Sequence, residues 1–299
     1  MLHFLPGPVR GIISLVLYAL NSFFWIWPVM VVSFARMLSP LKGWQNWARR
    51  AQDWIGRRWV DFNNLNIYLT QKIQWDIRMD QSLNMKEWYL IFCNHQSWAD
   101  ILVLQKVFIH RIPFMKFFIK SELKWLPVLG LASWAFELPF VKRYSREFLE
   151  KHPELKGRDI ELTRKACDKF KTIPVSITNF LEGTRFSRKK HGLQESPYEH
   201  LLKPRAGGIA IVMNAMQEYL RKIVNVTIAY PEARRSFWDF VSGKVTRVMV
   251  HVETIQIPDA LIGDYFGDAE FREGFQNWVN DLWEKKDARL ARMLNSARA

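Results

Sequence analysis

A histidine and an aspartate stand five positions apart at the end of an apolar run. Residues 89–93 read Tyr-Leu-Ile-Phe-Cys, Asn94 and His95 follow, and Asp100 comes five residues after the histidine. Imidazole accepts a proton near neutral pH, and a carboxylate bonded to its second nitrogen fixes the tautomer and stabilises the imidazolium that forms. The pair predicts a general base, His95, oriented by Asp100, without a serine or cysteine nucleophile.

The flanking residues predict how the pair is positioned. Ser97 and Asp100 are typical of a helix start, and the aliphatic residues that follow favour a helix from residue 98. Five residues along a regular helix turn through about 500°, which separates two side chains, so contact requires His95 on a loop before the helix. An isolated His-x4-Asp is more often a helix cap beside a surface histidine, and the assignment therefore needs further support.

That support comes from three later segments, each at the end of an apolar run. They are Phe140-Val141-Lys142-Arg143, Phe180-Leu181-Glu182-Gly183-Thr184-Arg185 and Val226-Thr227-Ile228-Ala229-Tyr230-Pro231. Together with the His95 segment, their order resembles the four motifs of the glycerolipid acyltransferases, the lysophosphatidate acyltransferase family. The resemblance covers residues 89–231, and the combination is specific where each motif alone is weak.

The resemblance implies a role for each matching residue. His95 becomes the general base with Asp100 as its partner, and the residues that hold a phosphorylated acceptor become Arg143, Glu182, Gly183, Thr184 and Arg185. A guanidinium grips phosphate oxygens through two charge-assisted hydrogen bonds, and glycine lets backbone amides approach closely. Each arginine alone is equally compatible with a solvated surface charge, and Glu182 with a structural ion pair to one of them.

Two departures from the family pattern concern the third motif. Leu181 stands where the family usually has proline, and Phe186 separates Arg185 from Ser187. Together with the sequence around His95, these features more closely resemble the lysocardiolipin and lysophospholipid branch. The identity of the acceptor head group is therefore left open.

The reaction that the resemblance implies is transfer of a fatty acyl group from a thioester to the free hydroxyl of a lysophospholipid such as 1-acyl-glycerol-3-phosphate. The donor is acyl-coenzyme A or acyl carrier protein, a co-substrate and partner, and no cofactor is expected. Cys93, Cys167 and the remaining histidines show no metal-like spacing, so no metal is expected either. The alternatives are a thioester hydrolase using the same site, or a membrane-tethered basic binding protein on a decayed acyltransferase scaffold.

The first 64 residues are typical of a membrane anchor. Residues 11–35 carry no charged side chain, and this segment is long enough to cross a hydrocarbon layer, which takes about 20 helical residues. Residues 43–64 alternate apolar and basic side chains, as an interfacial helix does. Whether the first helix spans the membrane or dips into one leaflet stays open. Basic residues after it outnumber Arg10 before it, which favours a cytoplasmic catalytic part, and the net charge of +14 suits anionic lipids without requiring nucleic acid.

Beyond the anchor, residues 65–299 predict an acyltransferase domain of the α/β class. Strands are expected at 66–79, 113–119, 223–230 and 245–257, and helices from 98, at 123–134, at 209–217 and at 269–294. The alternation predicts a mixed, mostly parallel sheet flanked by helices. Residues 188–203 read as a basic loop, and the apolar residues 125–136 as core packing rather than the lining of an acyl tunnel.

Overall fold

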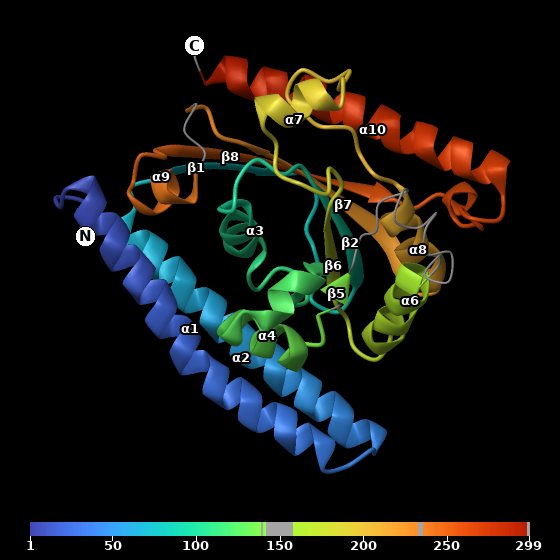
Figure 1. Ribbon diagram of the computed structural model, residues 1–299, viewed down its shortest axis with the longest axis horizontal. Coiled ribbons are helices and arrows are strands. Elements are labelled where there is room, and N and C mark those ends of the chain that lie inside the picture. Colours follow the sequence, from blue (N-terminus) through green and yellow to red (C-terminus); the bar gives the residue numbers. More distant parts are fainter. Residues whose placement is uncertain (139, 142–157, 233–235, 298–299) are drawn as a thin grey trace.

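A six-stranded sheet with helices on both faces forms the centre of the computed structural model, which describes residues 1–138, 140–141, 158–232 and 236–297 (Figure 1). The strands are β1 (Gln74–Met79), β2 (Trp88–Cys93), β3 (Met115–Phe117), β4 (Ile119–Lys120), β5 (Phe140–Val141), β6 (Ser176–Phe180), β7 (Leu220–Ala229) and β8 (Arg247–Gln256). The α-helices are α1 (Gly7–Met37), α2 (Lys42–Thr70), α3 (Asp100–Phe108), α4 (Pro127–Ala135), α6 (Arg158–Phe170), α7 (Arg188–Leu193), α8 (Gly207–Ala215), α9 (Phe237–Val241) and α10 (Ala269–Ser296). Two 3₁₀ turns, η1 (Ser121–Trp125) and η3 (Asp259–Leu261), complete the described elements.

The sheet is mixed and mostly parallel, as the sequence predicts. Its strand order is β1-β8-β7-β2-β6-β3, and the β7–β8 pair is antiparallel while the other neighbours run parallel. In the register of the central strand, Cys93 lies opposite Phe180 of β6 on one side and Val226 of β7 on the other. The segments that follow β2, β6 and β7 therefore leave the sheet at the same edge, where parallel α/β sheets place their sites.

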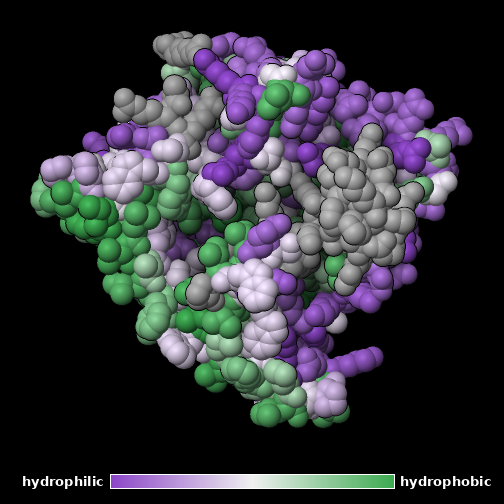
Figure 2. Space-filling model, in the orientation of Figure 1, coloured by the Kyte–Doolittle hydropathy of each residue, from purple (hydrophilic) through white to green (hydrophobic). Residues whose placement is uncertain are grey.

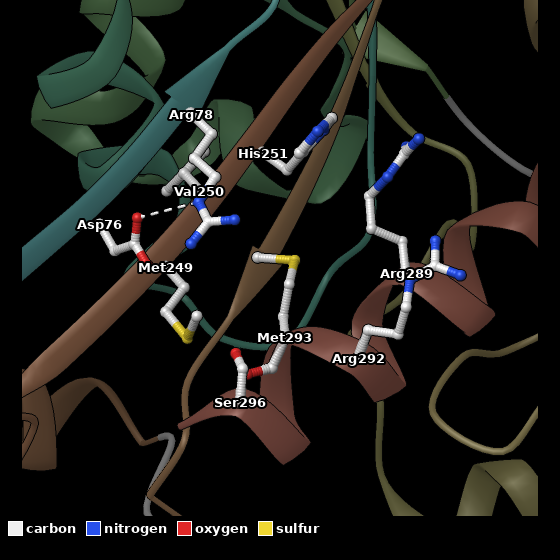
Figure 3. A pocket seen from close by; sticks show the side chains of 9 residues that line it. All are labelled: Asp76, Arg78, Met249, Val250, His251, Arg289, Arg292, Met293 and Ser296. Atoms are coloured by element: carbon white, nitrogen blue, oxygen red, sulfur yellow. Dashed lines mark hydrogen bonds and ion pairs between the residues drawn. The ribbon is translucent and has the colours of Figure 1, made fainter. Parts of the chain in front are cut away.

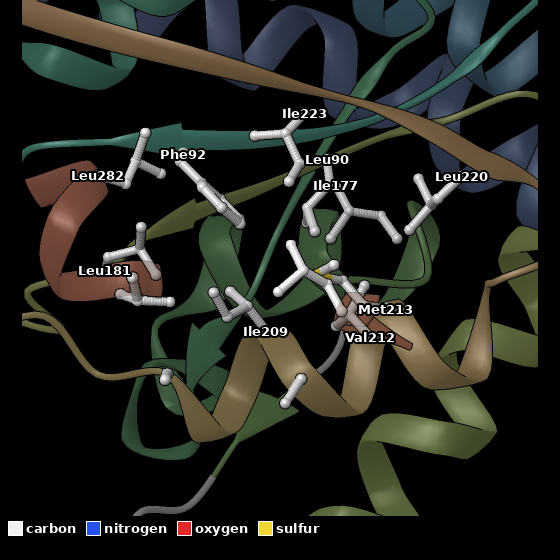
Figure 4. Close-up of a cluster of buried hydrophobic side chains, with 14 of the residues drawn as sticks. Leu90, Phe92, Ile177, Leu181, Ile209, Val212, Met213, Leu220, Ile223 and Leu282 are labelled. Carbon is white, nitrogen blue, oxygen red and sulfur yellow. The ribbon is translucent and has the colours of Figure 1, made fainter. Parts of the chain in front are cut away.

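Alternate residues of β2 supply the two cores. Leu90 and Phe92 point to the core beneath α6, α8 and α10, whereas Tyr89 and Ile91 point to the core that α3 and α9 close on the other face (Figure 4). A strand buried on both faces reads as a continuous apolar run, which is why residues 89–93 carry no polar side chain except the tyrosine hydroxyl. This central strand is the rigid support of the loop that follows it.

Helices α1 and α2 form a hairpin whose burial pattern is inverted. The residues of α1 that are buried against the protein include Gly11, Ser14 and Ser33, while its outward face carries large apolar side chains (Figure 2). Only 11% of its most apolar 18-residue window is buried, and the helix is long and apolar enough to cross a membrane. Polar side chains join the helices beside an apolar cluster that includes Val29 and Ile55. Asn21 donates to Asn63 at 2.9 Å and Asn66 to the Ser14 carbonyl at 3.0 Å.

The outward apolar surface of α1 continues onto α4, and together they are called the apolar face. The rings of Phe34 and Trp134 lie 6.1 Å apart where the two helices meet. The apolar face consists of Ile12, Val16, Leu20, Phe23, Phe24, Trp27, Val31, Phe34, Trp125, Leu126, Val128, Leu131 and Trp134, all exposed. The expectation that residues 125–136 form core packing is therefore wrong for the five exposed side chains of the segment, whereas Ala135 is buried in a cluster with Val29 and Ile55.

Three other sequence expectations are corrected. Residues 66–70 are the end of α2, not the start of a strand, and Asn66 is bonded to α1 there. The strand expected at 113–119 is split, since β3 pairs with β6 and β4 pairs with β5 in a separate two-stranded sheet. The start of the expected 188–203 loop is the helix α7.

Candidate active site

His95 lies on the loop between β2 and α3, as the sequence predicts. The residue before it, Asn94, is fully buried and pairs with the backbone of Ile228 in β7: its side-chain nitrogen donates to the Ile228 carbonyl at 2.9 Å, and its side-chain oxygen accepts from the Ile228 amide at 2.8 Å. The side chain of Asn94 thus takes the place of one pair of backbone hydrogen bonds between β2 and β7. His95 emerges from this fixed point.

The imidazole of His95 contacts the carboxylate of Asp100. Nδ1 of His95 lies 2.8 Å from Oδ2 of Asp100, and the His95 side chain keeps 14% of its surface exposed while Asp100 has none. With Asp100 as acceptor, the proton of the neutral imidazole is on Nδ1 and the lone pair is on Nε2. This arrangement leaves Nε2 as the nitrogen able to accept a proton.

Asp100 is itself held by four hydrogen bonds. Besides His95, Oδ2 accepts from the backbone amides of Gln96 at 2.7 Å and Ser97 at 2.9 Å, and Oδ1 accepts from the hydroxyl of Tyr230 at 2.7 Å. A carboxylate that accepts from several donors is fixed in orientation. The backbone amides of Gln96 and Ser97 are thus both engaged by Asp100.

Glu182 follows β6 and is completely buried behind the His95 loop. One carboxylate oxygen accepts from the backbone amide of His95 at 2.7 Å and the other from the amide of Leu202 at 3.0 Å. Burial raises the pKa of Glu182 to about 8, although the two amide donors oppose the rise. Its partners among the described residues are amides, so the geometry is that of a brace for the loop rather than an ion pair with Arg185.

The next three residues form a turn beside the histidine. Gly183 has φ +66°, a left-handed conformation that glycine adopts without strain, and its amide bonds the Phe180 carbonyl at 2.8 Å. The hydroxyl of Thr184 accepts from Lys190 of α7 at 2.7 Å. The guanidinium of Arg185 lies over the Trp98 ring, with 4.5 Å between its central carbon and the ring centroid.

The backbone ties this turn to the catalytic loop, because the amide of Phe186 donates to the carbonyl of His95 at 2.7 Å. Arg185 therefore directly precedes the residue that is bonded to the His95 loop. Arg143, the other predicted phosphate ligand, lies outside the described residues.

Two residues of the site carry no role in the sequence prediction. Tyr230, which bonds Asp100, is the tyrosine of the fourth motif, and Phe180, which stacks on His95 with 4.0 Å between ring centroids, is the first residue of the third. Both stand at strand ends level with His95, so their place in the motifs was an available signal. Neither contact could be deduced without the register of the sheet.

A cavity of about 330 Å³ lies elsewhere, between β1, β8 and the end of α10 (Figure 3). It is lined by Asp76, Arg78, Met249, Val250, His251, Arg289, Arg292, Met293 and Ser296. None of the predicted site residues lines it. Within the described part of the chain, no group of three histidine, cysteine or acidic side chains is placed to hold a metal ion, and Cys93 and Cys167 are buried free thiols.

A base-and-carboxylate pair at the edge of such a sheet, beside an arginine-bearing turn, is the arrangement of a glycerolipid-type acyltransferase. The family model described as Acyltransferase matches residues 74–231. The chain belongs to the acyltransferase family, which confirms the resemblance drawn from the sequence.

Curated relatives cover both branches that the sequence suggests. The chain is 30% identical over 220 residues to lysophosphatidylinositol acyltransferase 10 of Caenorhabditis elegans, covering 67% of this chain and 51% of that protein. It is 22% identical over 233 residues to 1-acyl-sn-glycerol-3-phosphate acyltransferase epsilon of Mus musculus (71% of this chain, 59% of that protein) and 25% identical over 219 residues to lysocardiolipin acyltransferase 1 of Gallus gallus (68% and 53%). The chain thus spans about half the length of the curated relatives it matches.

Among solved structures, the chain resembles the 1-acyl-sn-glycerophosphate (LPA) acyltransferase PlsC from Thermotoga maritima. The TM-score is 0.54 at 15% identity, and the match covers 95% of this chain and 98% of that one. This likeness shows the fold, including the helices that precede the sheet.

Proposed function

We propose that the protein transfers a fatty acyl group from an acyl thioester to the free hydroxyl of a lysophospholipid, with His95 as general base. The observation that carries the proposal is the 2.8 Å contact between His95 Nδ1 and the buried Asp100 carboxylate, which leaves Nε2 to act on the hydroxyl. Asp100 cannot turn away, since backbone amides and Tyr230 hold it. Such pre-organisation is what proton transfer in a transition state requires.

The reaction then proceeds in two bond changes. Nε2 of His95 takes the hydroxyl proton as the oxygen attacks the thioester carbonyl, and the resulting imidazolium is stabilised by Asp100. Collapse of the tetrahedral intermediate breaks the carbon–sulfur bond, and the thiolate leaves with the proton that His95 held. No acyl-enzyme forms, and the base contributes about 10²–10⁴-fold to the rate.

Arg185 is the described side chain best suited to the acceptor's phosphate. It follows the Gly183 turn next to the His95 loop, and stacking on Trp98 holds its planar guanidinium in one orientation. Bidentate pairing with a phosphate would align the acceptor hydroxyl with Nε2. Arg143 remains a second proposed phosphate ligand on the basis of its motif alone. The acceptor contacts proposed for Gly183, Thr184 and Glu182 also rest on the motif alone.

We also propose that the hairpin and α4 seat the protein on a membrane. Exposed apolar surface of this extent is costly in water and favourable in lipid. Interhelical hydrogen bonds between α1 and α2 accompany their apolar contacts, as in membrane helix pairs. The two helices run side by side, and α2 carries Arg49, Arg50, Arg57 and Arg58. Charged side chains are costly inside hydrocarbon, so this favours a hairpin embedded in one leaflet over a span.

The basic residues around the hairpin favour the cytoplasmic leaflet. Arg36 lies in the last turn of α1, and Lys42, Arg49 and Arg50 lie on α2. Each basic side chain near an anionic surface adds about 1 kcal/mol. The catalytic part would then face the cytoplasm, with soluble thioester donors on the same side as the site.

The test of the reaction is a panel assay with purified protein in mixed vesicles. Labelled acyl-coenzyme A or acyl carrier protein is offered with lysophosphatidate, lysophosphatidylinositol or monolysocardiolipin, and the labelled lipid is identified by mass spectrometry. His95→Ala is expected to lower the rate by at least about 10²-fold while leaving vesicle binding unchanged. Full transfer by that variant would refute the base assignment.

The same assay separates the two rival functions. Equal release of free fatty acid with and without lysolipid would indicate a thioester hydrolase. Absence of thioester turnover with every acceptor would favour a binding protein on an inactive scaffold.

The test of the membrane seat uses one pair of charge substitutions and a matched control. Leu20→Asp combined with Phe24→Asp is expected to release the protein from vesicles, because two apolar anchors worth about 2 kcal/mol each are replaced by charges. Leu193→Asp, at an equally exposed leucine on α7, is the control and lies on the opposite side of the molecule (Figure 1). Retention of the double variant on vesicles would exclude the apolar face as the seat.

A further inference from the structure

A buried lysine joins the edge of the sheet to α2 and to the end of α4. Lys116 of β3 donates through Nζ to the carbonyl of Phe136 at 3.0 Å and to Oδ1 of Asp53 in α2 at 3.4 Å. The side chains of Lys116 and Asp53 keep only 9% and 7% of their surface exposed. A buried ammonium is costly unless it is hydrogen-bonded, so the side chain of Lys116 is held at these two acceptors.

Aromatic rings complete the surroundings of the ammonium. Nζ of Lys116 lies 5.3 Å from the centroid of the Phe114 ring and 5.7 Å from that of Phe136, and the two rings stack with 5.0 Å between their centroids. Helix α2 approaches Phe114 closely, because a Cβ on Gly56 would lie 2.6 Å from that ring. The segment that leads into β3 is thus held against the hairpin by hydrogen bonds, ring contacts and close packing.

Strand β3 depends on such contacts because the sheet alone holds it weakly. It has three residues and stands at the end of the strand order, beside β6. An edge strand is bonded to the sheet on one side, and so short a strand has few backbone hydrogen bonds to fix it. Its position relative to β6 is therefore sensitive to the contacts of the Lys116 side chain.

The next residue of β3 leads to the base. The ring of Phe117 lies 6.4 Å from the ring of Phe180, with 20° between the planes, and the other side of this contact is the stack of Phe180 on His95. Rings at these separations are in contact, so the outer ring limits the movement of the middle one. A shift of β3 would consequently loosen the support of the imidazole.

We propose that Lys116 is a positioning residue that connects the α1–α2 hairpin to the base. Its two hydrogen bonds fix β3, β3 fixes the Phe117 ring, and that ring keeps Phe180 stacked on His95. The effect on the rate rests on the proposed function, whereas the effect on the position of the imidazole does not.

The experiment replaces Lys116 with methionine in the full chain, which removes the ammonium and keeps an unbranched side chain. NMR spectra of the protein with isotope-labelled histidine, assigned with His95→Ala, report the ring current of Phe180 on the imidazole. We expect the His95 resonances of Lys116→Met to move toward their positions in Phe180→Leu. We also expect kcat to fall about three- to tenfold with both KM values nearly unchanged.

Lys165→Met is the matched control for the lost lysine. It removes an exposed ion pair with Glu161 on α6 and should change neither the spectrum nor kcat. Wild-type His95 resonances in a folded Lys116→Met protein would overturn the proposal.

A double variant tests the route through the rings. If Lys116 acts through Phe180, Lys116→Met combined with Phe180→Leu should be no slower than Phe180→Leu alone, and rate losses that multiply would overturn the proposal. Phe117→Leu covers the case in which Lys116→Met folds poorly, because it leaves no buried polar group without a partner. It should move the same His95 resonances, and unmoved resonances would again refute the route. If the wild type had no transferase activity, the histidine spectra would still decide the positioning role, so the two failures are distinguishable.

Discussion

The imidazole of His95 lies face to face with the ring of Phe180, with 4.0 Å between the centroids and 17° between the planes. Phe180 is the last residue of β6, and its other side lies 6.4 Å from the ring of Phe117 in β3. Two adjacent strands thus fix the plane in which the imidazole lies. With the plane set by the sheet and Nδ1 held by Asp100, the direction of Nε2 is determined.

Removal of the ring at position 180 should lower turnover without affecting binding. Phe180→Leu keeps most of the volume but loses stacking worth about 0.5–1.5 kcal/mol, so we expect kcat to fall about three- to tenfold with both KM values nearly unchanged. Phe180→Tyr keeps the ring and is the control. Steady-state kinetics would contradict the positioning role if the leucine variant matched the wild type in kcat.

Tyr230 should matter to catalysis although its hydroxyl is buried away from the substrate side. Tyr230→Phe deletes the 2.7 Å bond to Asp100 and leaves one carboxylate oxygen with one donor fewer. Hydrogen bonds to charged groups contribute about 1.5–3 kcal/mol, so a fall in kcat of about ten- to one-hundredfold is expected. Thermal unfolding provides the check on folding, and an unaltered kcat would show that Asp100 is held without the tyrosine.

Arg185 should act on acceptor binding rather than on turnover. Arg185→Ala is expected to raise the acceptor KM by about ten- to one-hundredfold while the KM of the thioester donor stays constant. Arg188→Ala, at an exposed arginine of α7, is the matched control. An unchanged acceptor KM in Arg185→Ala would assign the phosphate to other side chains.

Glu137 joins the hairpin to the rest of the molecule through ion pairs. Its carboxylate lies 2.9 Å from Arg49 of α2, 3.1 Å from Arg36 of α1 and 3.6 Å from Lys169 of α6. Burial alone would raise the pKa of Glu137, but the bond from Arg49 and the surrounding positive charges outweigh it and lower the pKa below 4.5. The carboxylate form is therefore stabilised by folding.

The sign of the pH effect follows from the lowered pKa of Glu137. Its contribution to the free energy of unfolding is complete above pH 4.5 and is lost as the pH falls through the folded-state value. Glu137→Gln should lower the unfolding free energy by about 2 kcal/mol at pH 7 and remove this part of the acid dependence. Thermal unfolding in detergent at pH 7 and pH 4 measures both effects, and Glu161→Gln, which removes an exposed ion pair, is the control. If the unfolding free energies of Glu137→Gln and the wild type changed in parallel with pH, the ion pairs of Glu137 would not be the source of the acid dependence.

The contact between His95 and Asp100 was predictable from the sequence because its geometry is local. A strand, a short loop and a helix start suffice to bring His95 and Asp100 together. Arg185 was placed in the right turn by its motif. The brace formed by Glu182 was not predicted, because its partners are backbone amides of residues 87 and 20 positions away, and amides leave no signature in the side-chain pattern.

Of two other features, one was visible in the sequence and the other was not. Lys286 falls on the apolar stripe of α10, three positions after Trp283, so a charged residue on the buried face was visible as an anomaly. The helical state of residues 66–70 was hidden, because their alternation suits a strand and only the bonds to α1 keep them helical.

Asn94 makes the catalytic loop inseparable from the sheet. Since its side-chain amide exchanges two bonds with Ile228 on the neighbouring strand, the residue before His95 is part of the buried pairing of β2 with β7. The backbone of His95 therefore has no separate hinge about which it could move independently of the sheet. Heat inactivation and loss of tertiary structure should consequently share one midpoint, and the protein should stay fully competent until it melts.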